Sequence, residues 1–222
     1  MNQSPILGID HICLTVQSLS AQLEAWRYLG WKPHFTELGL PLQENKKPFM
    51  RRHHPLHDMA FLTAASGISV EIIRHHPEPS SFKGRYEIKF ANDQASVIGF
   101  LVKCRDLNLS SRFWKDGIGF TPDQSDASPH AFTFRSLMPR WSTKLFLDKS
   151  DCVAEDGFLD DEGYTCLSLM TRNIPDAETH LRQYGARDFG KAFNARVGQH
   201  NLKLNFFRGP EGELFELIEA LK

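Results

Sequence analysis

The chain has 222 residues, of which 26 are lysine or arginine and 27 are aspartate or glutamate, so its formal net charge is −1. Because nucleic acids and acidic membrane surfaces attract an excess of positive charge, this balance predicts neither as a partner. No apolar run approaches membrane-spanning length and no signal-peptide pattern opens the chain, so we expect a soluble protein of the cytoplasm.

The first predicted element is a strand at residues 8–16, in which polar and apolar residues alternate. Alternation puts different side chains on the two faces of the strand: Ile12, Leu14 and Val16 on one, and His11, Cys13 and Thr15 on the other. The apolar face can pack against a helix. An imidazole, a thiol and a hydroxyl suit the wall of a small polar cavity better than a hydrophobic core.

The residues that follow complete a strand–helix–strand–strand–strand (βαβββ) unit over residues 1–76. Ser18 caps a predicted helix that ends at Gly30. The three further strands are predicted at residues 31–37, 57–62 and 68–73. A basic cluster, Lys46 to His54, lies in the loop before the second of them. We interpret this cluster as a solvated loop, with a clamp for an anionic ligand as the alternative.

The same order of elements recurs twice further along the chain. Residues 77–96 are predicted to form a linker with a short strand at 86–90, because prolines and serines interrupt the pattern there. Residues 97–150 repeat the unit in degenerate form. After an acidic connection at 151–162, residues 163–222 repeat it clearly.

The first and third units agree residue by residue in their last two strands. Without gaps, Phe61 to Glu71 matches Phe206 to Glu216, and both segments end in a glutamate flanked by apolar residues. A carboxylate that points inward from such a strand is costly unless it is paired or coordinated. Both glutamates are therefore candidate site residues.

Four cysteines occur at spacings that form no C-x-x-C pair: Cys13, Cys104, Cys152 and Cys166. This usage is typical of a reducing compartment rather than of a disulfide framework. For Cys166 we favour inert packing in the core over a role as a soft metal ligand or a nucleophile.

Three βαβββ units resemble the vicinal oxygen chelate superfamily, which includes glyoxalase I, methylmalonyl-CoA epimerase, extradiol dioxygenases and the bleomycin and fosfomycin resistance proteins. The resemblance is carried by residues 10–16 and 208–218 and covers most of the chain apart from the linkers. It implies an α+β fold of three βαβββ modules, the middle one degenerate, that form curled mixed sheets with the helices outside. In that superfamily two modules pair side by side into a cup.

The resemblance also implies a divalent metal in the cup, held by the first and last strands of paired modules. The matching positions are His11 and Glu71 in the first module and Cys166 and Glu216 in the third. In the middle module they are Gly99 and Phe146, which cannot bind a metal. Three modules is an odd number, so a homodimer that completes a module pair is one solution.

Imidazole nitrogen and carboxylate oxygen suit Fe, Mn, Ni, Co or Zn. We expect His11 and Glu216 to be the firmest ligands, with Glu71 as a third ligand or a general base. Strand parity puts His57 on the same face, where it can complete a set of two histidines and one carboxylate with His11 and either Glu71 or Glu216. The same parity makes His200 a less favoured site residue. The alternative for His11 is a buried histidine bonded to a carbonyl.

The leading hypothesis is therefore a metal-dependent enzyme that acts on a small molecule with adjacent oxygens. Its chemistry is glyoxalase-, isomerase- or lyase-like, or that of a ring-opening dioxygenase. The alternative is a protein of the same fold that binds a drug or metabolite without metal. A purely structural module is weaker, because it leaves the polar strand faces unexplained.

Overall fold

The computed structural model describes residues 4–63, 68–90, 97–126, 128–137, 142–151 and 156–221. Cys152 lies outside the described residues, as do residues 91–96 of the linker. The described helices and strands confirm the predicted fold class, a mixed sheet built from three βαβββ modules. None of the described helices is long and apolar enough to span a membrane.

The first module begins with the strand that the sequence predicts. Its elements are β1 (Ile6–Thr15), α1 (Leu19–Tyr28), β2 (Lys32–Pro41), the short 3₁₀ helix η1 (Glu44–Phe49), β3 (Leu56–Thr63) and β4 (Ser69–His76). Helix α1 begins where predicted because the Ser18 side chain accepts a hydrogen bond from the backbone N–H of Ala21. It ends before Gly30, whose φ of 84° favours glycine.

Two short strands connect the first module to the second. They are β5 (Ser80–Lys83) and β6 (Tyr86–Phe90). The middle module then contains β7 (Val97–Cys104), α2 (Leu107–Arg112), the π-helical turn η2 (Phe113–Ile118), β8 (Thr121–Pro122), β9 (Ala131–Arg135) and β10 (Ser142–Lys149). The strand predicted within the linker is thus present as β6.

The third module has the same order of elements as the first. It consists of β11 (Asp161–Thr171), α3 (Ile174–Arg182), β12 (Phe193–Val197), β13 (His200–Arg208) and β14 (Leu214–Ala220). Helix α3 begins at Asn173, whose side chain accepts a hydrogen bond from the N–H of Asp176, and a proline occupies its first turn.

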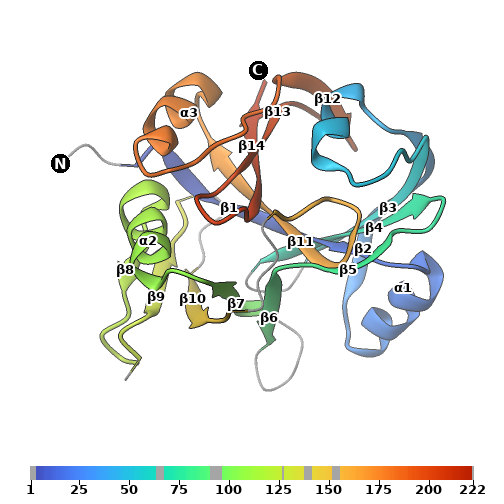
Figure 1. The fold of residues 1–222 in the computed structure, drawn as a ribbon. Helices are drawn as coiled ribbons and strands as arrows, with labels where there is room; N and C mark the ends of the chain where they lie inside the picture. The colour runs from blue at the N-terminus through green and yellow to red at the C-terminus, as the bar shows by residue number, and fades with distance from the viewer. Residues whose placement is uncertain are drawn as a thin grey trace.

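The first and third modules form the pair, and the middle module lies beside it. Strands β1 and β11 run antiparallel through the centre of the molecule (Figure 1). Each of them is flanked by the last strand of its own module, β4 beside β1 and β14 beside β11. Figure 1 shows α1 and α3 on opposite sides of this central pair, outside the sheet.

The middle module does not pair with the first strand of another module. Its strand β7 pairs instead with the linker strand β6, which contacts β11 through the pair Tyr86 and Tyr164. The first and third modules therefore complete their pair within one chain. A homodimer that supplies a partner to the middle module stays a prediction.

Gly99 shows why the middle module cannot carry a ligand at the position of His11. A Cβ atom built on Gly99 lies 2.3 Å from the backbone oxygen of Lys144 on the neighbouring strand β10. We predict that Gly99→Ala lowers the free energy of unfolding by about 1–3 kcal/mol, because the two strands must separate to admit the methyl group. Urea denaturation checks this, and wild-type stability would contradict the close approach of these backbones.

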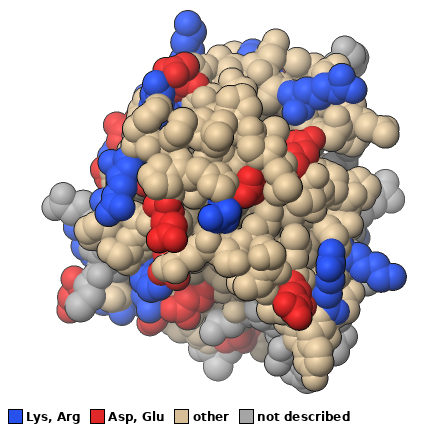
Figure 2. Space-filling view, turned by 90° about the vertical axis from the view of Figure 1, so that its right-hand side faces the viewer, with Lys and Arg blue, Asp and Glu red and all other residues tan. Residues whose placement is uncertain are grey.

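Apolar side chains form two clusters in the described residues. The larger one lies between the sheet and the helices and includes Trp114, Phe215 and Ile12. The smaller one lies on the other face of the β1–β11 pair, where Phe49 and Leu159 contact the sheet. On the face shown in Figure 2, acidic and basic side chains of the described residues are interspersed among larger areas of other residues.

Candidate metal centre

The register of β1 against β11 brings together residues that are 155 positions or so apart in the chain. His11 lies opposite Ser168, and Cys13 lies opposite Cys166. Across the parallel pairs, Cys13 lies beside Glu71, and Ser168 lies beside Glu216. The central strands therefore place one carboxylate from each module on either side of a histidine and two cysteines.

His11 is held in one orientation by its neighbour in the chain. Its Nδ1 donates to Asp10 Oδ2 at 2.8 Å, and the edge of the Phe61 ring packs against the imidazole. The other ring nitrogen, Nε2, faces the polar side of the sheet. A histidine whose far nitrogen is bonded to a carboxylate is the usual arrangement for a metal ligand, because that bond fixes the tautomer and the ring orientation.

Two carboxylates lie on either side of His11 Nε2. Glu71 Oε2 is 3.6 Å away and Glu216 Oε2 is 3.7 Å away. Ser168 Oγ lies 2.9 Å from the same nitrogen and donates a hydrogen bond of 2.7 Å to Glu216. The imidazole near the start of the chain and the carboxylate near its end thus share one buried site.

Cys13 completes a group that could hold a metal ion. Its Sγ lies 3.1 Å from Glu71 Oε2, and one donor atom each from His11, Cys13 and Glu71 lie within 4.8 Å of one another. Donors around a tetrahedral zinc lie about 3.3–3.8 Å apart, so small side-chain movements would bring all three onto one ion. Nitrogen, sulfur and oxygen together are a donor set that fits a divalent transition metal.

Cys13 was not among the ligands that the sequence predicted, although the signal was present. It shares the polar face of β1 with His11, two residues away, and only the register shows that Glu71 is its neighbour. Cys166 occupies the position in β11 that His11 occupies in β1, as the alignment predicted. It is fully buried beside Cys13 in the smaller apolar cluster.

Burial and neighbouring groups shift the pKa values of the site residues in opposite directions. Burial by itself would lower the pKa of His11, but hydrogen bonds to Asp10, Cys13 and Glu71 outweigh it and raise that pKa well above its usual value. Burial would raise the pKa of Glu71, yet the bond and charge of His11 lower it to about 2. Burial raises the pKa of Glu216, against the influence of His11 and Lys46.

A narrow cavity opens next to these residues. It has a volume of about 10 Å³, room for about one water molecule or one ion. It is lined by Cys13, Leu42, Lys46, His57, Glu71, Ile73, His75, Leu159, Phe206 and Glu216. The concave face of the paired modules is narrowed because η1 and the segment around Leu159 cover much of it.

His57 lines the same cavity from strand β3. It faces His75 across β3 and β4, four positions further along β4 than Glu71. Burial lowers the pKa of His57 to about 4 and that of His75 to about 3, so both rings are neutral. His57 is therefore not in the group around His11. His200 is exposed at the start of β13 and does not line the cavity.

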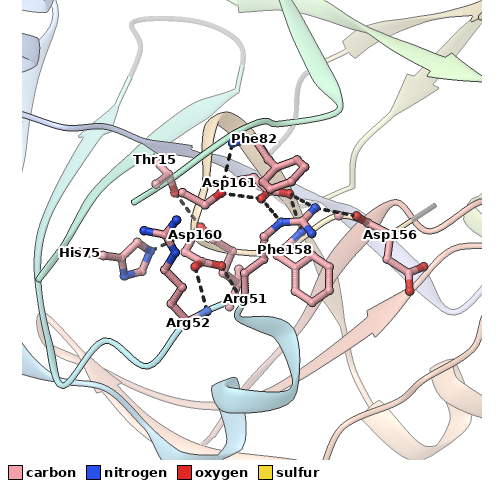
Figure 3. Close-up of polar contacts among 12 residues, drawn as sticks. Thr15, Arg51, Arg52, His75, Phe82, Asp156, Phe158, Asp160 and Asp161 are labelled. Atoms are coloured by element: carbon pink, nitrogen blue, oxygen red, sulfur yellow. Dashed lines mark hydrogen bonds and ion pairs between the residues drawn. The ribbon is translucent and has the colours of Figure 1, made fainter. Parts of the chain in front are cut away.

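The cover of the concave face consists of η1 and the segment around Leu159. A buried network of polar side chains holds this cover in place (Figure 3). Asp160 is fully buried and accepts hydrogen bonds from the backbone N–H groups of Arg51 and Arg52 and from His54 Nε2. The Arg51 guanidinium is paired with Asp161 and lies between two aromatic rings, as Figure 3 shows for Phe82 and Phe158. The residues after η1 are thus fastened to the start of β11.

Comparison with solved structures supports the architecture. Similar folds are found in a candidate dioxygenase from Bacillus subtilis (TM-score 0.52, 10% identity, 100% of this chain and 87% of that one) and in methylmalonyl-CoA epimerase from Mycobacterium tuberculosis (0.45, 14%, 100% and 93%). Glyoxalase I from Zea mays is a third (0.37, 15%, 96% and 67%). No protein-family model and no curated protein sequence matches the chain.

At these identities the likeness concerns the fold and not the activity. The predicted resemblance to the vicinal oxygen chelate superfamily is therefore confirmed at the level of the fold. The chain has a βαβββ architecture, with a candidate metal-binding group between its first and third modules.

Proposed function

We propose that this chain is a metal-dependent enzyme that acts on a small molecule with two adjacent oxygens. The observation that carries the proposal is the buried group of His11, Cys13 and Glu71, with Glu216 on the other side of the imidazole. Cys13, Glu71 and Glu216 line the small cavity, and carboxylates placed this close together are costly to bury unless a metal ion or a protonated group lies between them. One structural neighbour of the same fold, named as a candidate dioxygenase, is consistent with this class of function.

The residues have separate roles in this proposal. His11, Cys13 and Glu71 hold the metal, and Glu216 is a further ligand or a proton acceptor beside it. A bound divalent cation would polarise the substrate oxygens as a Lewis acid. Ser168 keeps Glu216 directed at the site, and Leu159 with Phe206 limits the entry of water. Glyoxalase- or isomerase-like chemistry and ring-opening oxygenation both fit this arrangement.

Metal analysis of protein purified without chelator tests the proposal. We expect close to one equivalent of Fe, Mn, Ni, Co or Zn per chain, lost on dialysis against a chelator and regained on adding one of these ions. Thiolate ligation by Cys13 would also give cobalt-loaded protein a sulfur-to-metal absorption band in the near ultraviolet. Protein that contains no metal and takes up none would refute the proposal.

The alternative is a metal-free binding protein for a drug or metabolite. A cup that included the middle module, with Gly99 and Phe146, would have favoured it. The cup is instead formed by the first and third modules, and its apolar side is already filled by Phe49 and Leu159. A large apolar ligand would need both segments to move, so a small polar ligand fits this cavity better.

Asp10 provides a test of metal binding that leaves the ligands intact. Asp10→Asn is expected to weaken metal binding about 10–100-fold, because the His11 imidazole loses the carboxylate that orients it. The Asp10 side chain is 33% exposed, so stability should change little. Competition with a coloured chelator measures the affinity. Glu87→Gln, in a surface ion pair, is the control. Equal affinities would exclude this role for Asp10.

A further inference from the structure

Lys46 contributes a positive charge to the cavity that contains Glu71 and Glu216. Its Nζ lies over the Phe206 ring, 5.4 Å from the ring centre. Phe206 pairs directly with Glu216 across β13 and β14. The ammonium group therefore lies near the third-module carboxylate, and Lys46 is the one lysine or arginine among the described residues that line this cavity.

Within the part of the chain that the structure describes, the ammonium group of Lys46 is not used in an ion pair. Among the described residues, no carboxylate oxygen lies within 4 Å of it. The next residue behaves differently, because Lys47 Nζ lies 2.7 Å from Glu44 in an ion pair within η1. A half-buried ammonium that has only an aromatic ring beneath it keeps its capacity for charge-assisted hydrogen bonds.

The position of Lys46 places it at the mouth of the cavity. Leu42 and Lys46 are partly exposed, whereas Cys13, His57 and Glu216 on the inner wall are buried. The inner part has room for about one ion. The organic part of any ligand that reaches such an ion must then lie at the mouth, within reach of the lysine.

The ammonium group of Lys46 indicates what kind of ligand this is. If the proposed function is right, Glu71, Glu216 and the Cys13 thiolate all face the divalent cation, whereas the hydrogen bonds of Lys46 have no carboxylate acceptor among the described residues. An anionic group on the ligand would accept them. We propose that Lys46 binds the carboxylate of a small substrate whose adjacent oxygens reach the metal group, a substrate of the 2-hydroxy carboxylate class. The basic cluster at residues 46–54 is then in part the clamp for an anion.

Two small probes separate charge from shape. Glycolate and glycolamide have the same size and the same pair of adjacent oxygens, but only glycolate is charged. We expect wild-type protein to bind glycolate more tightly than glycolamide by calorimetric titration. Lys46→Met should weaken glycolate binding about tenfold or more and leave glycolamide binding unchanged. Lys46→Arg should restore much of the preference, and the matched control Lys47→Met should bind both probes as wild type does.

Metal content, measured first on every variant, keeps this test apart from that of the proposed function. Metal-free wild-type protein would refute the metal centre, and the same two probes would still show whether Lys46 binds a carboxylate. Three results would overturn the inference: no saturable binding of glycolate, equal binding of the two probes by wild-type protein, or equal weakening of both probes by Lys46→Met.

Discussion

Replacing His11 with alanine is expected to weaken metal binding more than 100-fold, beyond the roughly 10–100-fold effect of losing an orienting neighbour. His11 Nε2 lies between Glu71 and Glu216, and its other nitrogen is held by Asp10, so no other described residue can take its place. Competition with a coloured chelator measures the affinity, and circular dichroism checks that the variant is folded.

The cysteines and the second histidine sharpen this test. Cys13→Ser should abolish the sulfur-to-cobalt absorption band, because Cys13 Sγ is the sulfur within the metal-binding group. Cys166→Ser should keep the band. His57→Ala is the matched control, because His57 lines the same cavity but lies beside His75 and not in the group around His11. This variant should bind metal as wild type does. Loss of metal binding in His57→Ala, with His11→Ala unaffected, would show that the metal is held around His57 and not around His11.

Asp160→Ala is expected to lower the free energy of unfolding by about 3–5 kcal/mol, because three hydrogen-bond donors lose their acceptor at about 1–3 kcal/mol each. Asp160 is fully buried and accepts hydrogen bonds of 2.7 Å and 3.2 Å from the N–H groups of Arg51 and Arg52. His54 Nε2 lies 3.0 Å from it. The alanine removes the acceptor of all three donors, and Figure 3 shows the contacts that Asp160 makes near Arg51 and Arg52.

Urea denaturation measures this effect, with Glu87→Ala as the control. Glu87 pairs with Lys103 on the surface, so its loss should cost no more than about 1 kcal/mol. A similarly small loss for Asp160→Ala would show that the network does not fasten the cover. If the cover is loosened as we expect, Asp160→Ala should also bind metal less tightly, because η1 no longer shields the cavity.

The repeated pattern of the sequence predicted most of the fold. Alternation in β1, the cap at Ser18, and the match of Phe61–Glu71 with Phe206–Glu216 are local signals that are read from a few neighbouring residues. The same signals placed His11, Glu71 and Glu216 on the polar faces of their strands. Alternation decides the face of a strand because it depends on the backbone alone.

What the sequence could not decide is which strands lie side by side. The pairing of β1 with β11 skips the whole middle module, and it results from packing between segments far apart in the chain. That register, and not any local pattern, makes Cys13 a neighbour of Glu71 and Ser168 a neighbour of His11. It also leaves His57 beside His75 and outside the group of His11, Cys13 and Glu71, although its parity is correct.

By itself, then, the sequence determined three βαβββ units, the polar face of the first strand and the two glutamates that end matching hairpins. The tertiary structure decided that the first and third units pair, that Cys13 joins the candidate ligands, and that Lys46 lies at the mouth of their cavity. The physical reason is the distance along the chain between the residues that interact. Strand periodicity and helix caps depend on near neighbours, whereas register and the covering of a concave sheet depend on how distant apolar and charged surfaces fit together.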